Sequence, residues 1–315
     1  MKTNKTLLQS LLLYIIRELP DQEATSQYFQ EKYKRLKKDE KWNLYYFIDK
    51  TPLLNAHLDN VGSKEAHKNL HNVKIENGII KGSHNIGADD KCWLAFIDYV
   101  LTVNWLIDDN PDYSILLTVQ EETGMGWSSY AIKTHKKQIE DCNFIILLDR
   151  RNSWDIIQYC DTDLLSDIQD IAKDYNYKIA EWSLSDLDNL CWLCPWVNLS
   201  CWYYNPHTNT EYIKWDEYVN AVEFATHILD DLYYNEDYKT YTRDFWYNYN
   251  YWYNYKTYDR DTKARTYWKN NQKQNDTSKF DFDDETIDIK QSITLYDEHN
   301  DNWVYIKQWT YTIIG

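Results

Sequence analysis

Glycine and proline are both scarce in this chain of 315 residues. Only 7 glycines and 5 prolines are present, beside 15 tryptophans and 29 tyrosines. Average usage of roughly 7% would give about 22 glycines in a chain of this length. Few positions therefore have the freedom to adopt the left-handed backbone that tight turns use. The deficit itself needs an explanation.

Long apolar runs are also missing. No segment approaches the roughly 20 apolar residues that cross a bilayer, so we expect no membrane partner. The amino end begins with basic residues and an apolar run, but Gln9 and Ser10 interrupt that run and no small-residue cleavage site follows. We expect an amphipathic first helix rather than a signal peptide, and a cytoplasmic protein.

Basic residues are fewer than acidic ones. The 34 Lys and Arg face 50 Asp and Glu, which gives a net charge of −16. This balance argues against nucleic acid or an anionic membrane as the partner and favours a small substrate. The six cysteines are scattered, and the pair Cys191 and Cys194 has no second C-x-x-C to complete a zinc ribbon. We interpret them as reduced thiols of a cytosolic protein.

Apolar strands alternate with helical patterns between about residues 43 and 230. Periodicity predicts helices over 91–107, 128–139, 163–174 and from about 215, and strands over 43–48, 52–59, 113–119, 143–149 and 196–200. The pair Asn77-Gly78 predicts a tight hairpin. This order predicts an α/β fold, with a sheet covered by helices on both faces and acids at strand ends, where such sheets carry their sites.

The composition changes beyond about residue 235. The next fifty residues are biased toward Tyr, Asn, Lys and Asp and have no clear period. We predict a main domain over 1–235, a low-complexity linker over 236–285 and a small β appendage over 286–315. Aromatic residues among basic ones would suit stacking on single-stranded nucleic acid, but the interspersed acids oppose that partner.

Acidic and imidazole side chains stand in five clusters at the ends of predicted elements: His57/Asp59, Asp89/Asp90, Glu121/Glu122, Asp149/Arg150 and Asn205/His207. One such cluster alone is usually a solvated loop. Together they form the nitrogen and oxygen ligand set that suits zinc, cobalt or manganese. Neighbouring residues in an extended chain point oppositely, so Glu121 and Glu122 cannot bind one metal in the same way. One can bind metal while the other faces the attacking water.

The motifs NAHLDNVG (55–62), IGADDK (86–91), TVQEETGMG (118–126), ILLDRR (146–151) and NLSCWYYNPHTNTEY (198–212) occur in this order. The series resembles the co-catalytic zinc exopeptidases, which include tripeptidase T, the aminoacylases and the zinc aminopeptidases. The resemblance implies a three-layer α/β/α fold with a mixed sheet and a site for two zinc ions, with cobalt or manganese as alternatives. It implies that His57 and Asp149 bind the first metal, that Glu122 and His207 bind the second, and that Asp89 bridges both.

The resemblance also implies roles around the metals. Glu121 would be the general base, and Asp59 would hold His57. On a strand, residues i and i+2 share a face, so Asp59 lies on the side of His57 and can help to fix its tautomer. Further candidates for supporting the ligands or contacting substrate are Asp90, Arg150, Asp186, Tyr204, Asn205 and Glu211.

The activity implied by this resemblance is metal-dependent hydrolysis of a peptide bond in short peptides, by an enzyme of aminopeptidase type. The widest gap between successive ligands, from Asp149 to His207, is 58 residues, too short for an inserted lid domain of about 100 residues. Two alternatives stay open: an amidohydrolase acting on N-acyl amino acids with the same fold, and a non-catalytic binding module. A general base such as Glu121 has no obvious value in a binding module. The oligomeric state stays open.

Tryptophan stands where the resembled family has glycine. The positions are Trp93, Trp127, Trp154 and Trp202, with Trp42 and Trp182 fitting the same pattern. The 7 glycines and 15 tryptophans together match the roughly 22 glycines of average usage. Richness in Lys, Asn, Tyr and Ile suggests an AT-rich gene, which depletes glycine but does not enrich a residue encoded only by UGG. We hypothesise that the source reads UGA as glycine; the alternative is true tryptophan in a divergent relative.

Overall fold

A computed structural model describes residues 3–61, 64–108, 113–122, 126–158, 162–180, 193–233, 238, 287–297 and 302–313. The chain divides into two compact units, Met1–Tyr247 and Asn248–Gly315. Asp186 and, apart from Tyr238, the predicted linker over 236–285 lie outside the described residues.

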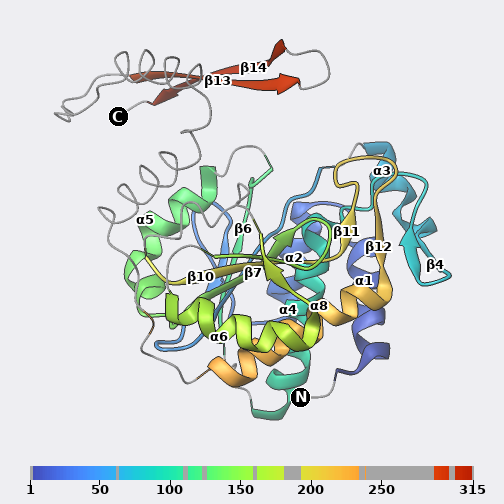
Figure 1. Cartoon of the computed structure of the whole chain (residues 1–315), viewed down its shortest axis with the longest axis vertical. Coiled ribbons are helices and arrows are strands. Elements are labelled where there is room, and N and C mark those ends of the chain that lie inside the picture. Colours follow the sequence, from blue (N-terminus) through green and yellow to red (C-terminus); the bar gives the residue numbers. More distant parts are fainter. Residues whose placement is uncertain are drawn as a thin grey trace. The chain divides into compact units, whose positions relative to one another are not determined.

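A mixed sheet forms the centre of the larger unit (Figure 1). Its eight described strands lie in the order β1-β2-β6-β3-β7-β10-β8-β9. Their bounds are Lys37–Lys38 (β1), Leu44–Tyr46 (β2), Leu53–His57 (β3), Ser114–Thr118 (β6), Ile145–Arg150 (β7), Asp155–Ile157 (β8), Lys178–Ile179 (β9) and Trp196–Ser200 (β10). The four central strands β6, β3, β7 and β10 are parallel, and β2 and β8 flank them antiparallel.

Helices cover both faces of this sheet (Figure 1). The described helices of the larger unit are α1 (Lys5–Glu18), α2 (Gln22–Lys32), α3 (Lys64–Asn69), α4 (Ala88–Asp108), α5 (Gly126–Glu140), α6 (Thr162–Ala172) and α8 (Trp215–Leu232), with 3-10 turns at Leu70–Asn72 and Lys173–Tyr175. Helix α4 packs on β3 and β7, α1 packs on α4, and α5 packs on β6. The central strands are buried almost throughout because both faces are covered, which explains their continuous apolar runs. The predicted α/β class and mixed sheet are confirmed.

A second, smaller antiparallel sheet carries two of the loops that build the site. Its strand order is β11-β12-β5-β4, with bounds Tyr203–Tyr204 (β11), Tyr212–Lys214 (β12), Ile79–Lys81 (β5) and Lys74–Glu76 (β4). Strands β4 and β5 form the predicted hairpin, and Asn77 and Gly78 at its turn have φ of 51° and 75°. Asn and Gly tolerate this left-handed backbone, which explains the pair.

The described part of the second unit is a hairpin of two long antiparallel strands, β13 (Ile287–Asp297) and β14 (Asn302–Ile313). Both strands fall within the predicted appendage over 286–315.

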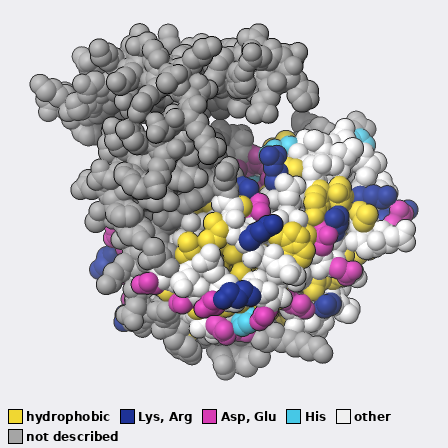
Figure 2. Space-filling view, in the orientation of Figure 1, with side chains coloured by type: hydrophobic (Ala, Val, Ile, Leu, Met, Phe, Trp, Pro, Cys, Tyr) yellow, Lys and Arg dark blue, Asp and Glu magenta, His cyan; other side chains and the backbone are white. Residues whose placement is uncertain are grey.

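On the face drawn in Figure 2, acidic side chains gather over α6 and α8 and are mixed with Lys and Arg. None of the described helices combines the length and the apolar character needed to cross a membrane.

We expect the chain 1–247 to fold, and the chain 1–235 to be less stable by about 1.5–3 kcal/mol. Tyr238 is buried, and its hydroxyl donates to Asp167 Oδ2 at 2.7 Å. The shorter chain loses that burial. Urea unfolding of both chains measures the difference, with Tyr238→Ala in 1–247 as the matched variant. Equal stabilities of the two chains would contradict the expectation.

Candidate active site

The carboxyl ends of three adjacent parallel strands bring four of the predicted residues together. His57 is the last residue of β3, Asp149 lies near the end of β7, and Glu121 and Glu122 follow β6. Strand β3 pairs with both β6 and β7, and His57 lies opposite Thr118. The ends of parallel neighbours meet at one edge of a sheet, so these side chains converge.

The other two predicted ligands come from loops. Asp89 lies in the first turn of α4 but has a non-helical backbone, with φ −84° and ψ 107°, and its peptide bond to Asp90 is cis. His207 lies between β11 and β12 with φ 63°. The small sheet therefore supplies one histidine, and the main sheet supplies the other.

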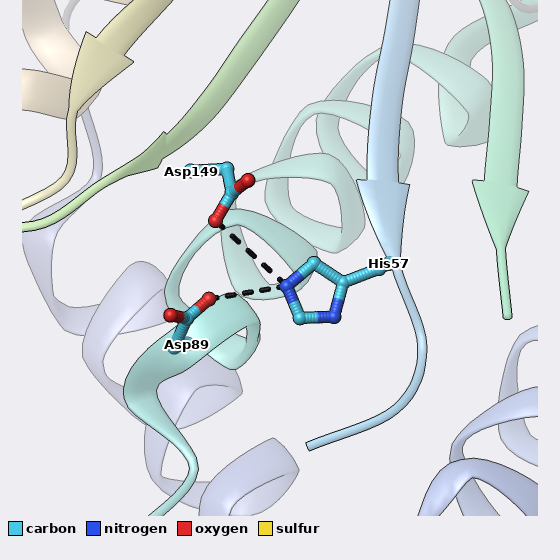
Figure 3. A group of neighbouring side chains, drawn as sticks. All are labelled: His57, Asp89 and Asp149. Atoms are coloured by element: carbon cyan, nitrogen blue, oxygen red, sulfur yellow. Dashed lines mark hydrogen bonds and ion pairs between the residues drawn. The ribbon is translucent and has the colours of Figure 1, made fainter. Parts of the chain in front are cut away.

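His57, Asp89 and Asp149 form the first cluster (Figure 3). His57 Nε2 lies 3.1 Å from Asp89 Oδ1 and 3.8 Å from Asp149 Oδ1. The other ring nitrogen, Nδ1, lies 2.9 Å from the backbone oxygen of Asp59. If Nδ1 donates its proton to that oxygen, the Nε2 lone pair faces the two carboxylates. Three acceptor atoms then point at one place, an arrangement that suits a cation.

Asp89, Glu122 and His207 form the second cluster. His207 Nε2 lies 3.3 Å from Asp89 Oδ2 and 2.8 Å from Glu122 Oε1. Glu122 Oε1 is buried and has no hydrogen-bond partner, so its short contact with the imidazole lacks the geometry of a hydrogen bond. Asp89 thus turns one oxygen toward each histidine, as a carboxylate shared by two metals would.

The electrostatics of the two clusters favour a bound cation. Burial lowers the pKa of His57, but Asp149, Asp59 and Asp89 raise it well above its ordinary value. Asp89 and Glu122 raise the pKa of His207 to about 10. Burial, with Asp89 nearby, raises the pKa of Asp149 to about 8. Without a metal, the negative charge of these crowded, buried carboxylates is balanced by protons on the two histidines and on Asp149.

The residues present fit zinc. Within each cluster the ligand atoms lie within 4.8 Å of one another. Ligand atoms that lie about 2.0–2.2 Å from a tetrahedral zinc ion are separated from one another by about 3.3 Å. The four distances from histidine Nε2 to carboxylate oxygen are close to this value, at 3.1, 3.8, 3.3 and 2.8 Å. Imidazole nitrogen and carboxylate oxygen are also the donors that zinc, cobalt and manganese accept. All three potential metal-binding groups among the described residues belong to this site.

No family model and no curated protein matches the sequence. Among solved structures, the aminopeptidase PepT from Bacillus cereus ATCC 10987 is similar, with a TM-score of 0.60 and 13% identity over 72% of this chain and 98% of that chain. A tripeptidase from Staphylococcus aureus subsp. aureus Mu50 has a TM-score of 0.52 and 14% identity over 72% and 98%. A TET aminopeptidase from the marine sediment archaeon Thaumarchaeota archaeon SCGC AB-539-E09 has a TM-score of 0.53 and 10% identity over 71% and 97%. The chain has the aminopeptidase fold. At these identities the likeness establishes the fold alone, and it confirms the fold expected from the motifs.

Asp59 lies next to His57 in this aminopeptidase fold and has additional contacts with the two glutamates. Its carboxylate accepts hydrogen bonds from the backbone N–H groups of Glu121 and Glu122, both at 3.1 Å. Its Oδ1 also lies 3.7 Å from His57 Nδ1, and the same ring nitrogen lies 2.9 Å from the Asp59 backbone oxygen. Burial raises the pKa of Asp59, but His57 and the two N–H groups lower it more. One carboxylate therefore positions both glutamates. Glu121 lies in a third group with His57 and Glu122, within ligand spacing of both.

Asp90 holds the backbone of His57. It is fully buried, and its Oδ2 accepts a hydrogen bond from the backbone N–H of His57 at 3.2 Å. Burial, with Asp149 and Asp89 nearby, raises the pKa of Asp90 well above its ordinary value. The contact joins the first residue after Asp89 to the strand that ends at His57.

Arg150 and Tyr204, two of the further candidates, each form a hydrogen bond with a neighbouring carboxylate. Arg150 Nε donates to Asp155 Oδ2 at 2.8 Å, and the Tyr204 hydroxyl donates to Glu217 Oε2 at 2.8 Å. Each contact stabilises local structure beside the site. A role for either side chain in binding substrate stays a prediction.

The loop that carries His207 is held by its own polar side chains. Asn205, with φ 53°, donates from Nδ2 to the Thr210 backbone oxygen at 3.4 Å. Thr208 Oγ1 donates to the Asn205 backbone oxygen at 2.8 Å. These contacts close the loop, so Asn205 lies where it can set the position of His207.

Glu211 holds the segment that leads to Asp89. Its Oε2 accepts hydrogen bonds from the backbone N–H groups of Ile86 at 2.9 Å and Ala88 at 3.1 Å. Glu211 is almost completely buried, and it joins β12 of the small sheet to the residues immediately before Asp89. Glu211 thus fits the expected role of supporting a predicted ligand through the segment that precedes Asp89.

Burial raises the pKa of Glu211 to about 7 from an ordinary value of 4.5. Because the folded-state pKa is higher, the stability that protonation provides is complete below pH 4.5 and is lost as the pH rises through 7. The metal-free wild type should therefore lose about 3 kcal/mol between pH 4.5 and 8 relative to Glu211→Gln. Urea unfolding of both proteins at several pH values measures this difference. The exposed variant Glu76→Gln is the control, and a constant difference across the range would contradict the assignment.

Asn198 is a residue that the sequence reasoning missed. It lies in β10, is buried, and its Oδ1 accepts a hydrogen bond from the backbone N–H of Asp149 at 3.1 Å. The sequence feature that could have identified it is an amide side chain inside the apolar strand at 196–200, because a buried polar group needs a specific hydrogen-bond partner. Asn198 fixes the end of β7 and with it the Asp149 carboxylate.

Proposed function

We propose that this chain is a metal-dependent, aminopeptidase-like hydrolase that cleaves a peptide bond in short peptides, with two zinc ions and Glu121 as general base. The observation that carries the proposal is the position of Asp89, whose two carboxylate oxygens lie 3.1 Å and 3.3 Å from two histidines. Each histidine has a further carboxylate, Asp149 or Glu122, beside it. The aminopeptidase fold of the whole matched region agrees with this assignment.

His57, Asp89 and Asp149 would hold one ion, and Asp89, Glu122 and His207 the other. Bound zinc supplies Lewis acidity, which polarises the scissile carbonyl and makes the attacking water more acidic. The Glu121 carboxylate takes the proton of that water and passes it to the nitrogen of the leaving amine. Asp59 holds the backbone of Glu121, so that the carboxylate stays close to the reacting atoms.

The openness of the site favours short substrates. The side chain of His207 is 42% exposed, whereas that of His57 is 2% exposed. Substrate and water can thus reach the second cluster from solvent. The intervals between successive ligands are at most 58 residues, too short for an inserted lid domain of about 100 residues that would enclose a longer chain.

Metal reloading combined with a substrate panel tests the proposal. The protein is stripped with a chelator, reloaded with zinc, cobalt or manganese, and incubated with dipeptides, tripeptides and N-acetyl amino acids. We expect free amino acids to be released from peptides by the reloaded protein only. Hydrolysis confined to N-acetyl amino acids would replace the peptidase by an amidohydrolase. Two bound metals with no hydrolysis of any substrate would favour a binding module and overturn the proposal.

A further inference from the structure

Three tryptophans have a backbone conformation that normally belongs to glycine. Among the described residues other than glycine, ten have a positive φ, and they are four asparagines, three tryptophans, Lys50, Gln120 and His207. Asparagine adopts this region readily because its short side chain bonds locally. For a bulky residue the same region is a true outlier. The three tryptophans are Trp42, Trp154 and Trp202, with φ of 75°, 70° and 64°.

The backbone of Trp202 is fixed from two sides. Its N–H donates to the Asn152 carbonyl at 3.1 Å, and its carbonyl accepts from the N–H of Lys214 at 3.4 Å. Trp202 lies between β10 and β11, directly before the loop that carries His207. Because backbone bonds define the turn, its positive φ is a property of the fold and not of the indole.

Trp154 has its own turn and crowds Trp202. Its carbonyl accepts from the N–H of Lys178 at 2.8 Å, which ties the turn between β7 and β8 to β9. The rings of Trp154 and Trp202 meet edge to face, with centroids 4.1 Å apart. Two adjacent left-handed turns therefore each carry the largest side chain available.

Trp42 gives independent support because burial does not compensate for its backbone. Its side chain is 51% exposed, and the Trp42 N–H donates to the Asp39 carbonyl at 3.1 Å. Asp39 Oδ1 accepts from the N–H groups of Lys41 and Asn43 at 2.8 Å and 3.1 Å. Asp39 thus builds a tight turn around this residue, and the exposed indole contributes little burial to it.

The other tryptophans of the pattern are less informative. Trp93 has a helical backbone in α4, is buried and stacks on Phe96. Its conformation does not call for glycine. Trp182 and the side chain of Trp127 lie outside the described residues.

We propose that residues 42, 154 and 202 are glycine in the native protein, encoded by UGA codons that the source reads as glycine. The backbone at these three turns supports the proposal, and so does the composition of 7 glycines and 15 tryptophans. The inference is independent of the proposed function. It also removes the indole of Trp202 from the turn directly before the His207 loop, together with the Trp154 indole that packs against it.

The gene and the native protein provide the direct test. We expect UGA at codons 42, 154 and 202, and a mass spectrum of peptides from the native source that contain glycine there. UGG codons, or peptides with tryptophan at these positions, would overturn the proposal.

A stability series tests the backbone argument by itself. Synthetic genes encode the chain with glycine at positions 42, 154 and 202, or with alanine at all three. Both remove the indoles, and only alanine keeps the Cβ that the left-handed region disfavours. We expect glycine to raise the folded-to-unfolded ratio by about fivefold or more per position over alanine. At Trp215, the first residue of α8, the order should reverse, with alanine favoured over glycine. Equal stability of the two triple variants would overturn the argument even if the tryptophan version fails to fold.

Discussion

Replacing Glu121 by glutamine should lower the turnover of peptide hydrolysis by about 10²–10⁴-fold while both metals stay bound. Glutamine keeps the size of the side chain but cannot accept the proton of the attacking water. Glu121 lies within ligand spacing of His57 and Glu122, yet neither of the two clusters that share Asp89 contains it. Its loss should therefore spare the metals.

Turnover and metal content of Glu121→Gln are measured on the same preparation, by release of amino acids and by elemental analysis. The exposed variant Glu140→Gln on α5 is the matched control and should match the wild type in both. Loss of a metal without loss of turnover would mean that Glu121 and Glu122 have each other's roles.

Replacing Asp89 by asparagine should weaken both metal sites at once and lower turnover by about 10³-fold, since bound metal contributes several kcal/mol to this chemistry. Asp89 Oδ1 faces His57 and Oδ2 faces His207. Asparagine keeps one oxygen and puts an NH₂ group, which cannot bind a cation, in the other place. In contrast, Asp149→Asn and Glu122→Gln should each weaken one site.

Stepwise zinc titration of the three variants distinguishes these outcomes, with thermal stabilisation by zinc as a readout that does not need activity. Normal binding of a second ion by Asp89→Asn would show that its carboxylate is not shared.

The sequence predicted the strands and helices with strong periodicity and missed those without it. The central strands were found because covered faces demand continuous apolar runs. Helix α2 was missed because its buried residues are Thr25, Ser26 and Phe29, which make no apolar stripe. Its start is marked instead by the cap Asp21, whose side chain accepts from the N–H of Ala24.

The grouping of candidate ligands followed from the rule that parallel strands end together, whereas the contacts beyond the ligands did not. Strand β3 ends at His57, so the strand rule does not give the contacts of the Asp59 carboxylate with the backbone of Glu121 and Glu122. Glu121 and Glu122 lie in a turn after Gln120, whose φ is 59°, rather than in extended chain. Glu211 follows His207 through a closed loop and reaches the Asp89 segment on another part of the chain.

The different origins of the two histidines would make the two metal positions of the proposed site unequal. His57 belongs to a fully buried strand of the main sheet, and His207 belongs to a half-exposed loop of the small sheet. An ion held by His57 leaves only if a packed strand end moves, whereas an ion held by His207 leaves when a short loop opens. The outer position should therefore exchange quickly with the ions of the medium, and the inner one should retain its metal through purification.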